Sequence, residues 1–347
     1  MPFNVSAATT IASLEIRQRI RSTKWKWTLG ILFALISLLI LGSLGLTLMV
    51  GGTYAAWSRF LFDLALGIVL FLGLVAAPTM SATSINGDRR DATLAVIQAT
   101  PITSTELAVG KWLGSWLASL ALIAVAAPYL LWGVFTGPVS LLGAVLGIVV
   151  LAILLGCYCA IGLGFSSLTA RPAASAMLTQ STVLLLLVGL PILFGMTLPL
   201  VTQSHEVTTS SHSPETPGEC TNAQVNQDFL HTERTWWLLA ANPLLIVSDA
   251  IASGVERGPA EYGESASSLP AAGLSIARSG PYLKGSVCLE EYGDYRYGRQ
   301  VHETRFIGTS WYIGLIFNMV LGALGLSVAS RRLRVPAHKL AKGVRVA

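Results

Sequence analysis

Apolar residues gather in six long blocks along the chain, separated by short polar stretches and one long one. Each block is about 20 residues or longer, the length that an α-helix needs to cross the hydrocarbon core of a bilayer. The pattern therefore predicts an all-α polytopic membrane protein with six transmembrane helices. The predicted spans are Thr28–Val50, Trp57–Met80, Leu107–Phe135, Leu141–Phe165, Pro172–Val201 and Ile307–Ala329.

Different patterns flank these blocks. Residues 1–24 are polar and basic, with apolar residues at helical spacing, and they predict an amphipathic helix lying at the membrane interface. Residues 25–201 hold spans one to five, residues 202–306 form a large insertion, and residues 307–330 form span six. Residues 331–347 are a basic tail.

Composition agrees with a membrane protein. Hydrophobic residues make up 53% of the chain and charged residues only 12%. A soluble domain carries roughly twice that charged fraction, so the composition excludes a disordered chain and argues against an ordinary soluble enzyme. The net charge of +5 has to be judged by its distribution along the chain, because membrane proteins sort their basic residues by side.

Charge predicts the orientation of the spans. Six spans place both chain ends on one side, where the ends and loops carry 15 basic residues and 4 acidic ones. The insertion at 202–306 carries 7 basic and 13 acidic residues. The positive-inside rule then places both termini in the cytoplasm of a bacterial-type plasma (inner) membrane and the insertion outside it. The basic excess is thus a topology signal and does not indicate nucleic-acid binding.

The polar loop between spans two and three predicts a short amphipathic helix at about 86–100. Asp88 falls in its first turn, where an acid suits the positive end of the helix dipole. Leu94 and Ile97 share one face, and Pro101 ends the helix. Such a helix suits docking into a groove on a cytoplasmic partner; the alternative is a connector that rests on lipid headgroups.

This loop resembles that of the permease subunits of ATP-binding-cassette (ABC) exporters of the type-2 class, over about residues 80–200. That family's loop has an acidic start, a Gly-Thr-Leu run, a proline, a later Glu and a Gly-Lys pair. The positions that match by identity or type are Asp88, Arg89, Thr93, Leu94, Ile97, Pro101, Glu106, Gly110 and Lys111. The positions that depart from the pattern are Arg90, Asp91, Ala92, Ala95 and Gln98.

The resemblance implies a transmembrane permease subunit of an ATP-driven exporter, which would not be an enzyme by itself. Its substrate would be hydrophobic or amphipathic: a lipid, glycolipid, peptide or drug. A separate nucleotide-binding ATPase subunit would hold ATP and Mg²⁺, since the chain has no Gly-x-x-x-x-Gly-Lys-[Ser/Thr] run. A second permease subunit, identical or related, would complete the route, and no cofactor would bind the chain directly. The implied ATPase-coupling residues are Asp88, Arg89, Thr93, Leu94, Ile97 and Pro101.

Polar residues inside the spans offer candidates for a translocation route. Most such residues hydrogen-bond neighbouring helices, and some could line a path for an amphipathic substrate. The candidates are Ser37, Ser43, Gln180 and Asn318.

The insertion divides by composition. Residues 202–233 are rich in Ser, Thr and Glu and predict a loop, and the apolar stretch at about 235–252 is too short to span and predicts a re-entrant segment. The rest predicts a small lid. Cys220 and Cys288 are the only cysteines of the insertion, and an oxidising compartment favours a disulfide between them over two free thiols.

The insertion also holds four of the five histidines, but their spacing fits no standard ligand pattern, so no metal site is expected. Two other functions remain open at this point. One is a membrane-anchored enzyme acting through the extracytoplasmic domain, although the insertion has no Gly-x-Ser-x-Gly or HExxH run. The other is a membrane-anchored sensor or scaffold.

Overall fold

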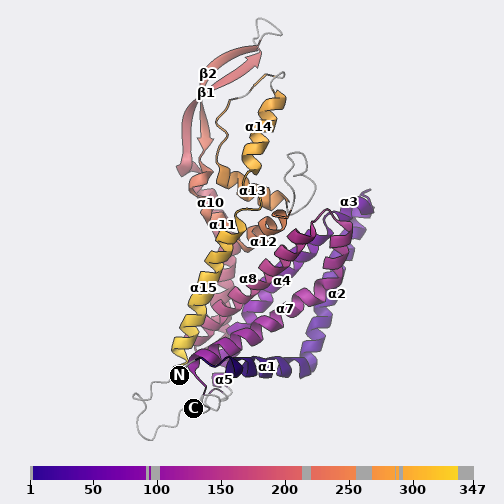
Figure 1. Cartoon of the computed structure of the whole chain (residues 1–347), viewed down its shortest axis with the longest axis vertical. Helices are drawn as coiled ribbons and strands as arrows, with labels where there is room; N and C mark the ends of the chain where they lie inside the picture. Colours follow the sequence, from indigo (N-terminus) through magenta and orange to yellow (C-terminus); the bar gives the residue numbers. More distant parts are fainter. Residues whose placement is uncertain are drawn as a thin grey trace. The chain divides into compact units, whose positions relative to one another are not determined.

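A computed structural model of the chain describes residues 3–90, 94, 102–212, 220–254, 268–285, 287–288 and 292–334 (Figure 1). The chain divides into two compact units. Unit 1 comprises Met1–Gly137, Gly147–Leu185 and Leu315–Ala347, and unit 2 comprises Pro138–Leu146 and Leu186–Gly314.

Long apolar helices confirm the six predicted spans. Within the described residues, six helices are long and apolar enough to cross a membrane. Their cores are α2 (Thr23–Met49), α4 (Leu61–Ala82), α7 (Ser104–Thr136), α8 (Leu141–Leu168), α9 (Pro172–Leu184) with α10 (Leu190–Thr197), and α15 (Trp311–Arg332). A π-helical turn, η1 (Leu185–Gly189), joins α9 to α10, and a 3₁₀ turn, η2 (Leu198–Val201), follows α10.

Shorter helices complete unit 1: α1 (Val5–Arg21), α3 (Tyr54–Ser58) and α5 (Ser84–Arg90). The long helices pack closely where one of them carries glycine. A Cβ on Gly133 of α7 would lie 2.6 Å from the backbone nitrogen of Phe62 in α4. The indole nitrogens of Trp112 and Trp116 each donate to a carbonyl of α8 at 2.8 Å. These contacts fix α7 against both α4 and α8.

Two predictions for unit 2 are wrong: the chain is not all-α, and residues 202–233 are not a loop. The strands β1 (Thr202–His212) and β2 (Cys220–Leu230) form an antiparallel hairpin there. The strands pair from Thr202↔Leu230 to His212↔Cys220. Thr and Val suit a pleated strand. The strands escape prediction because β2 is largely exposed on both faces, so no alternation of apolar and polar residues marks it.

The other secondary-structure elements in the described part of unit 2 are helices. After the 3₁₀ turn η3 (Thr232–Arg234) come α11 (Trp237–Ala240), α12 (Pro243–Ala252), α13 (Ser268–Ser279) and α14 (Tyr292–Thr304). Asn242 organises the start of α12: its Oδ1 accepts from Leu244 N at 2.9 Å, and its Nδ2 donates to the Leu187 carbonyl of η1 at 2.8 Å. One amide therefore caps α12 and supplies a partner to a carbonyl of the π-helical turn.

Cys220 and Cys288 are joined in the structure as a disulfide, with their Cα atoms 6.3 Å apart. Replacing both cysteines by serine should lower the stability of unit 2 by about 2–4 kcal/mol, because the bridge restricts the unfolded chain. Thermal unfolding with and without reductant measures this effect. Serine at Cys157 and Cys159, the buried free pair in α8, serves as the comparison, since reductant should then still lower the unfolding temperature. Equal unfolding temperatures of the native chain in both conditions would contradict the bridge.

Candidate functional site

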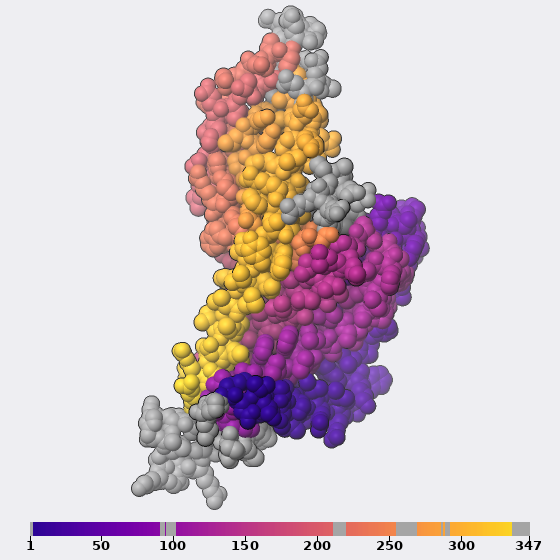
Figure 2. Space-filling view, viewed as in Figure 1, coloured from indigo at the N-terminus to yellow at the C-terminus, as the bar shows by residue number. Residues whose placement is uncertain are grey.

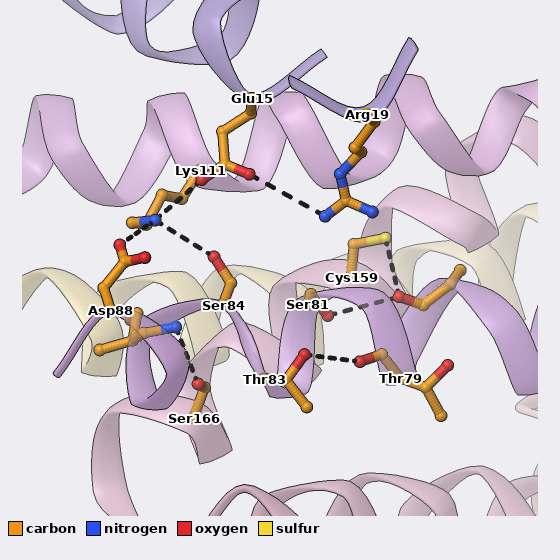
Figure 3. A network of polar contacts seen from close by, with 12 residues as sticks. Glu15, Arg19, Thr79, Ser81, Thr83, Ser84, Asp88, Lys111, Cys159 and Ser166 are labelled. Carbon is orange, nitrogen blue, oxygen red and sulfur yellow. Dashed lines mark hydrogen bonds and ion pairs between the residues drawn. The ribbon is translucent and has the colours of Figure 1, made fainter. Parts of the chain in front are cut away.

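A buried lysine connects three helices at one end of unit 1. Lys111, on α7, is 2% exposed (Figure 3). Its Nζ lies 2.8 Å from Glu15 Oε1 of α1, 2.5 Å from Asp88 Oδ2 of α5, and 3.4 Å from Ser84 Oγ of α5. Arg19 approaches Glu15 at 3.9 Å. We call Glu15, Ser84, Asp88 and Lys111 the Lys111 cluster.

The charges of this cluster hold α1, α5 and α7 together. One ammonium group lies between two carboxylates, whose side chains are 20–25% exposed. Removing charge from water is costly, and the interaction between the partners offsets that cost only while the geometry holds. Separating α5 or α1 from α7 would therefore leave a poorly hydrated charge, so the three helices are favoured to move together.

A shared cap positions α1 and α7. Thr103 and Glu106 form a capping box at the start of α7: the Thr103 hydroxyl accepts from Glu106 N, and Glu106 Oε2 accepts from Thr103 N at 2.8 Å. The other carboxylate oxygen, Oε1, accepts from Asn4 N at 2.7 Å, and Asn4 is the N-cap of α1. One carboxylate thus fixes the start of both helices.

Glycine allows α1 to lie directly on α7. A Cβ on Gly110 would lie 2.7 Å from Ile11 Cβ and 2.8 Å from the Ala8 carbonyl oxygen. One turn later, a Cβ on Gly114 would lie 2.8 Å from Glu15 Cβ. In Figure 2 the indigo residues of α1 lie against the magenta residues of α7. The Gly-x-x-x-Gly run of α7 is therefore the docking surface for α1, and it brings Glu15 to Lys111.

Gly110→Val should detach α1 from α7. The added side chain meets backbone as well as Ile11, so relief needs movement of the helix, and we expect a loss of about 1–3 kcal/mol. Thermal unfolding gives the stability, and the rate of proteolysis within α1 reports the detachment. Gly42→Ala in α2 is the control, because a Cβ added there meets no described residue outside its own stretch of helix within 4 Å. Unchanged proteolysis of α1 in Gly110→Val would show that the close contact does not hold the helix.

Hydrogen bonds join the start of α5 to the C-terminal end of α8. Ser166 Oγ accepts from the backbone nitrogens of Ile85 and Asn86 at 3.1 and 3.2 Å. The Asn86 amide donates to Thr169 Oγ1 at 3.2 Å, and Asn86 is 1% exposed. The Ser166 hydroxyl of α8 thus supplies an acceptor for two of the first backbone donors of α5.

Leu94 packs into the same end of unit 1. It is 7% exposed and belongs to an apolar cluster of buried residues from α1, α5, α7, α8 and α15. Its neighbours there are Ile11, Ile85, Leu107, Ala108, Leu163, Ala329 and Leu333. Leu94 therefore packs against residues of its own chain.

The six predicted coupling residues do not lie together in the described part of the structure. Asp88 lies in the Lys111 cluster, and Arg89 is exposed, with its Nη1 3.4 Å from the Ser167 carbonyl. The helix α5 covers Ser84–Arg90, so it begins two residues before the predicted segment at 86–100 and includes the start of that segment. Thr93, Ile97 and Pro101 lie outside the described residues.

Sequence reasoning matched Lys111 to a motif but did not predict its role, and it missed Glu15 altogether. The available signal was a lysine placed several residues inside an apolar block. Such a charge needs a partner, and an acid on a neighbouring helix is the usual one.

All four candidate route residues hydrogen-bond a neighbouring helix. Ser37 accepts from the Tyr129 hydroxyl at 2.7 Å, and Ser43 accepts from Trp57 Nε1 at 2.9 Å. Gln180 Nε2 donates to the Val75 carbonyl at 2.9 Å. Asn318 is fully buried, and its Oδ1 accepts from the Tyr158 hydroxyl at 3.0 Å. Each of these bonds stabilises helix packing, which does not require a route through the chain.

Histidines of unit 2 also contact each other. The Nε2 atoms of His205 and His231 are 2.8 Å apart, and His231 Nδ1 lies 2.7 Å from Glu233 Oε1. Among the residues that the structure describes, no group of three or more His, Cys, Asp or Glu side chains is arranged to hold a metal ion.

The sequence is similar to one known protein family over most of its length. Residues 9–269 match the family described as ABC-2 family transporter protein. The matched range includes most of α1, the Lys111 cluster, five of the six spans and part of unit 2. No match was found among curated proteins. Since the match covers more than half of the chain, the chain belongs to the ABC-2 family of transporter membrane proteins.

Proposed function

We propose that the chain is the permease subunit of an ATP-driven exporter and that a separate ATPase subunit drives it through α5 and the loop that follows. Membership of the ABC-2 family supports the permease role. The observation that carries the coupling proposal is the Lys111 cluster, which ties α5 to a predicted membrane span and to α1.

The mechanism follows from these ties. ATP and Mg²⁺ would bind the ATPase subunit, and closure of that subunit would displace the loop after α5. Because Asp88 pairs with buried Lys111, displacement of α5 pulls on α7, and because Glu15 pairs with the same ammonium group, α1 follows. Leu94, a short distance after α5 in the sequence, is held in the apolar cluster. The exposed contact for the ATPase would then include Arg89, with Leu94 acting as an internal anchor.

Spans one and five are the most exposed of the six, which favours a second permease subunit packing against them. Only 11% of the apolar window in each of these spans is buried within the chain, compared with 28–67% in the other four. Two copies, or this chain and a relative, would cover these faces and form the route between them. Apolar, uncharged faces suit a hydrophobic or amphipathic substrate that leaves the cytoplasm or the inner leaflet. The charge distribution supports cytoplasmic termini in a bacterial-type plasma membrane.

Charge reversal at Arg89 tests the coupling surface. In complexes purified with the ATPase subunit, Arg89→Asp should weaken retention of that subunit by about tenfold, equivalent to about 1.4 kcal/mol. Arg296→Asp, the same reversal on exposed α14 of unit 2, should leave retention unchanged. Equal unfolding temperatures for the two variants would exclude a folding defect. Retention that is equal in both variants would remove Arg89 from the ATPase contact.

A further inference from the structure

Unit 2 contains a cavity that the permease role does not use. It has a volume of about 520 Å³, within the range of roughly 300–1,000 Å³ typical of small-molecule sites. Its walls come from β2, the segment that follows α13, and one face of α14. Four aromatic side chains line it: Phe229, Tyr282, Tyr292 and Tyr295.

The aromatic walls are held in place by packing. The rings of Tyr282 and Tyr295 meet edge to face, with centroids 5.7 Å apart. The ring of His302 also lies against Tyr282, with its centroid 5.5 Å away. A Cβ on Gly298 would lie 2.7 Å from the Tyr282 hydroxyl oxygen, so glycine at this position lets Tyr282 approach α14. The aromatic surface formed by Tyr282 and Tyr295 is therefore pre-formed in the absence of a ligand.

Hydrogen-bond donors and acceptors line the cavity beside these rings. Arg299 Nε pairs with Glu303 Oε1 at 2.7 Å, and both side chains line the cavity. Lys284 Nζ lies 5.6 Å from the centre of the Tyr282 ring. Gln227 adds an amide that can donate and accept. The cavity thus offers donors and acceptors together, with an excess of only one positive charge.

We propose that this cavity binds a saccharide. A pyranose ring has an apolar C–H face that packs on aromatic side chains, and a rim of hydroxyl groups that both donate and accept hydrogen bonds. Two cationic side chains disfavour a cationic ligand, and Glu303 disfavours a polyanion. The saccharide could be a free oligosaccharide or the headgroup of a glycolipid. This inference does not depend on the permease function, because binding needs no ATPase.

The test uses the full-length chain, purified in detergent and fluorescently labelled, on an array of gluco-, galacto-, manno- and N-acetylglucosamine oligosaccharides. We expect retention on at least one of these classes. Tyr295→Ala and Glu303→Gln should each weaken that retention by about tenfold. The control is Tyr297→Ala, which removes a tyrosine of the same helix that is 58% exposed and does not line the cavity. An intact Cys220–Cys288 disulfide on non-reducing gels shows that each variant has folded.

The source of the saccharide is resolved with vesicles. A chain that binds the array, and that binds phosphatidylcholine vesicles more strongly when they contain galactosyl diacylglycerol, takes a glycolipid headgroup. A chain that binds the array but shows no such gain on vesicles takes a free saccharide. The proposal is overturned by the absence of retention on every glycan class, or by equal losses in Tyr295→Ala and Tyr297→Ala.

Discussion

Lys111→Met is expected to lower the free energy of unfolding by about 3–5 kcal/mol, because it removes the ammonium group from between two carboxylates in a largely buried site. Glu15 and Asp88 would then face each other without the cation that joins them. Thermal unfolding of the purified chain in detergent measures the loss. The effect should exceed that of any surface substitution in unit 1.

Neutralisation of the whole cluster separates stability from coupling. The triple variant Glu15→Gln, Asp88→Asn and Lys111→Met removes the three charges of the cluster and leaves only Arg19, whose side chain is 22% exposed, without its Glu15 partner. It should therefore regain most of the stability that Lys111→Met loses. It should nevertheless couple poorly to the ATPase, since the ties from α5 to α7 and α1 are weaker. A triple variant as unstable as Lys111→Met would show that packing, and not charge, accounts for the loss.

Asp249→Ala is the second substitution with a large expected effect. Asp249 lies in α12 and is fully buried. Its Oδ1 accepts from Gly308 N at 2.7 Å, and its Oδ2 accepts from Ser310 N at 2.7 Å and Trp311 N at 2.8 Å. Burial raises the pKa of this carboxyl, and the three N–H donors and Arg278 oppose that shift. The side chain thus caps the start of α15.

Loss of this cap should cost about 3 kcal/mol or more, because three backbone donors lose their acceptor together. Hydrogen–deuterium exchange over 306–314 measures the effect where it arises, and exchange there should accelerate in Asp249→Ala. Asp249→Asn retains an acceptor oxygen and should show a smaller change. Asp294→Ala on α14, an exposed acid of the same unit, should show none. Unchanged exchange at 306–314 in Asp249→Ala would contradict the capping role.

The membrane spans could be predicted because membrane thickness sets the length of an apolar block, and that constraint acts within each block separately. The capping box could also be recognised from sequence, since Thr103 and Glu106 are three residues apart in a known pattern. In both cases the physical cause lies within a short stretch of chain.

The features that escaped prediction depend on contacts between distant segments. Glu15 and Lys111 are 96 residues apart, and Asp249 and Ser310 are 61 apart, so no local pattern relates them. The β1–β2 hairpin escaped for another reason. It is polar and mostly exposed, and without a buried face a strand has no hydrophobic period to detect. Leu94 is buried, and the apolar residues around it come from distant segments of the same chain.

Site-specific photo-crosslinking at position 89 of the full-length chain, expressed in its own host, tests the central claim most directly. The account predicts that the crosslinked partner is an ABC ATPase subunit and that a crosslinker at position 296 captures no such subunit. Capture of other proteins at position 89, with no ATPase recovered in stoichiometric amount, would contradict it.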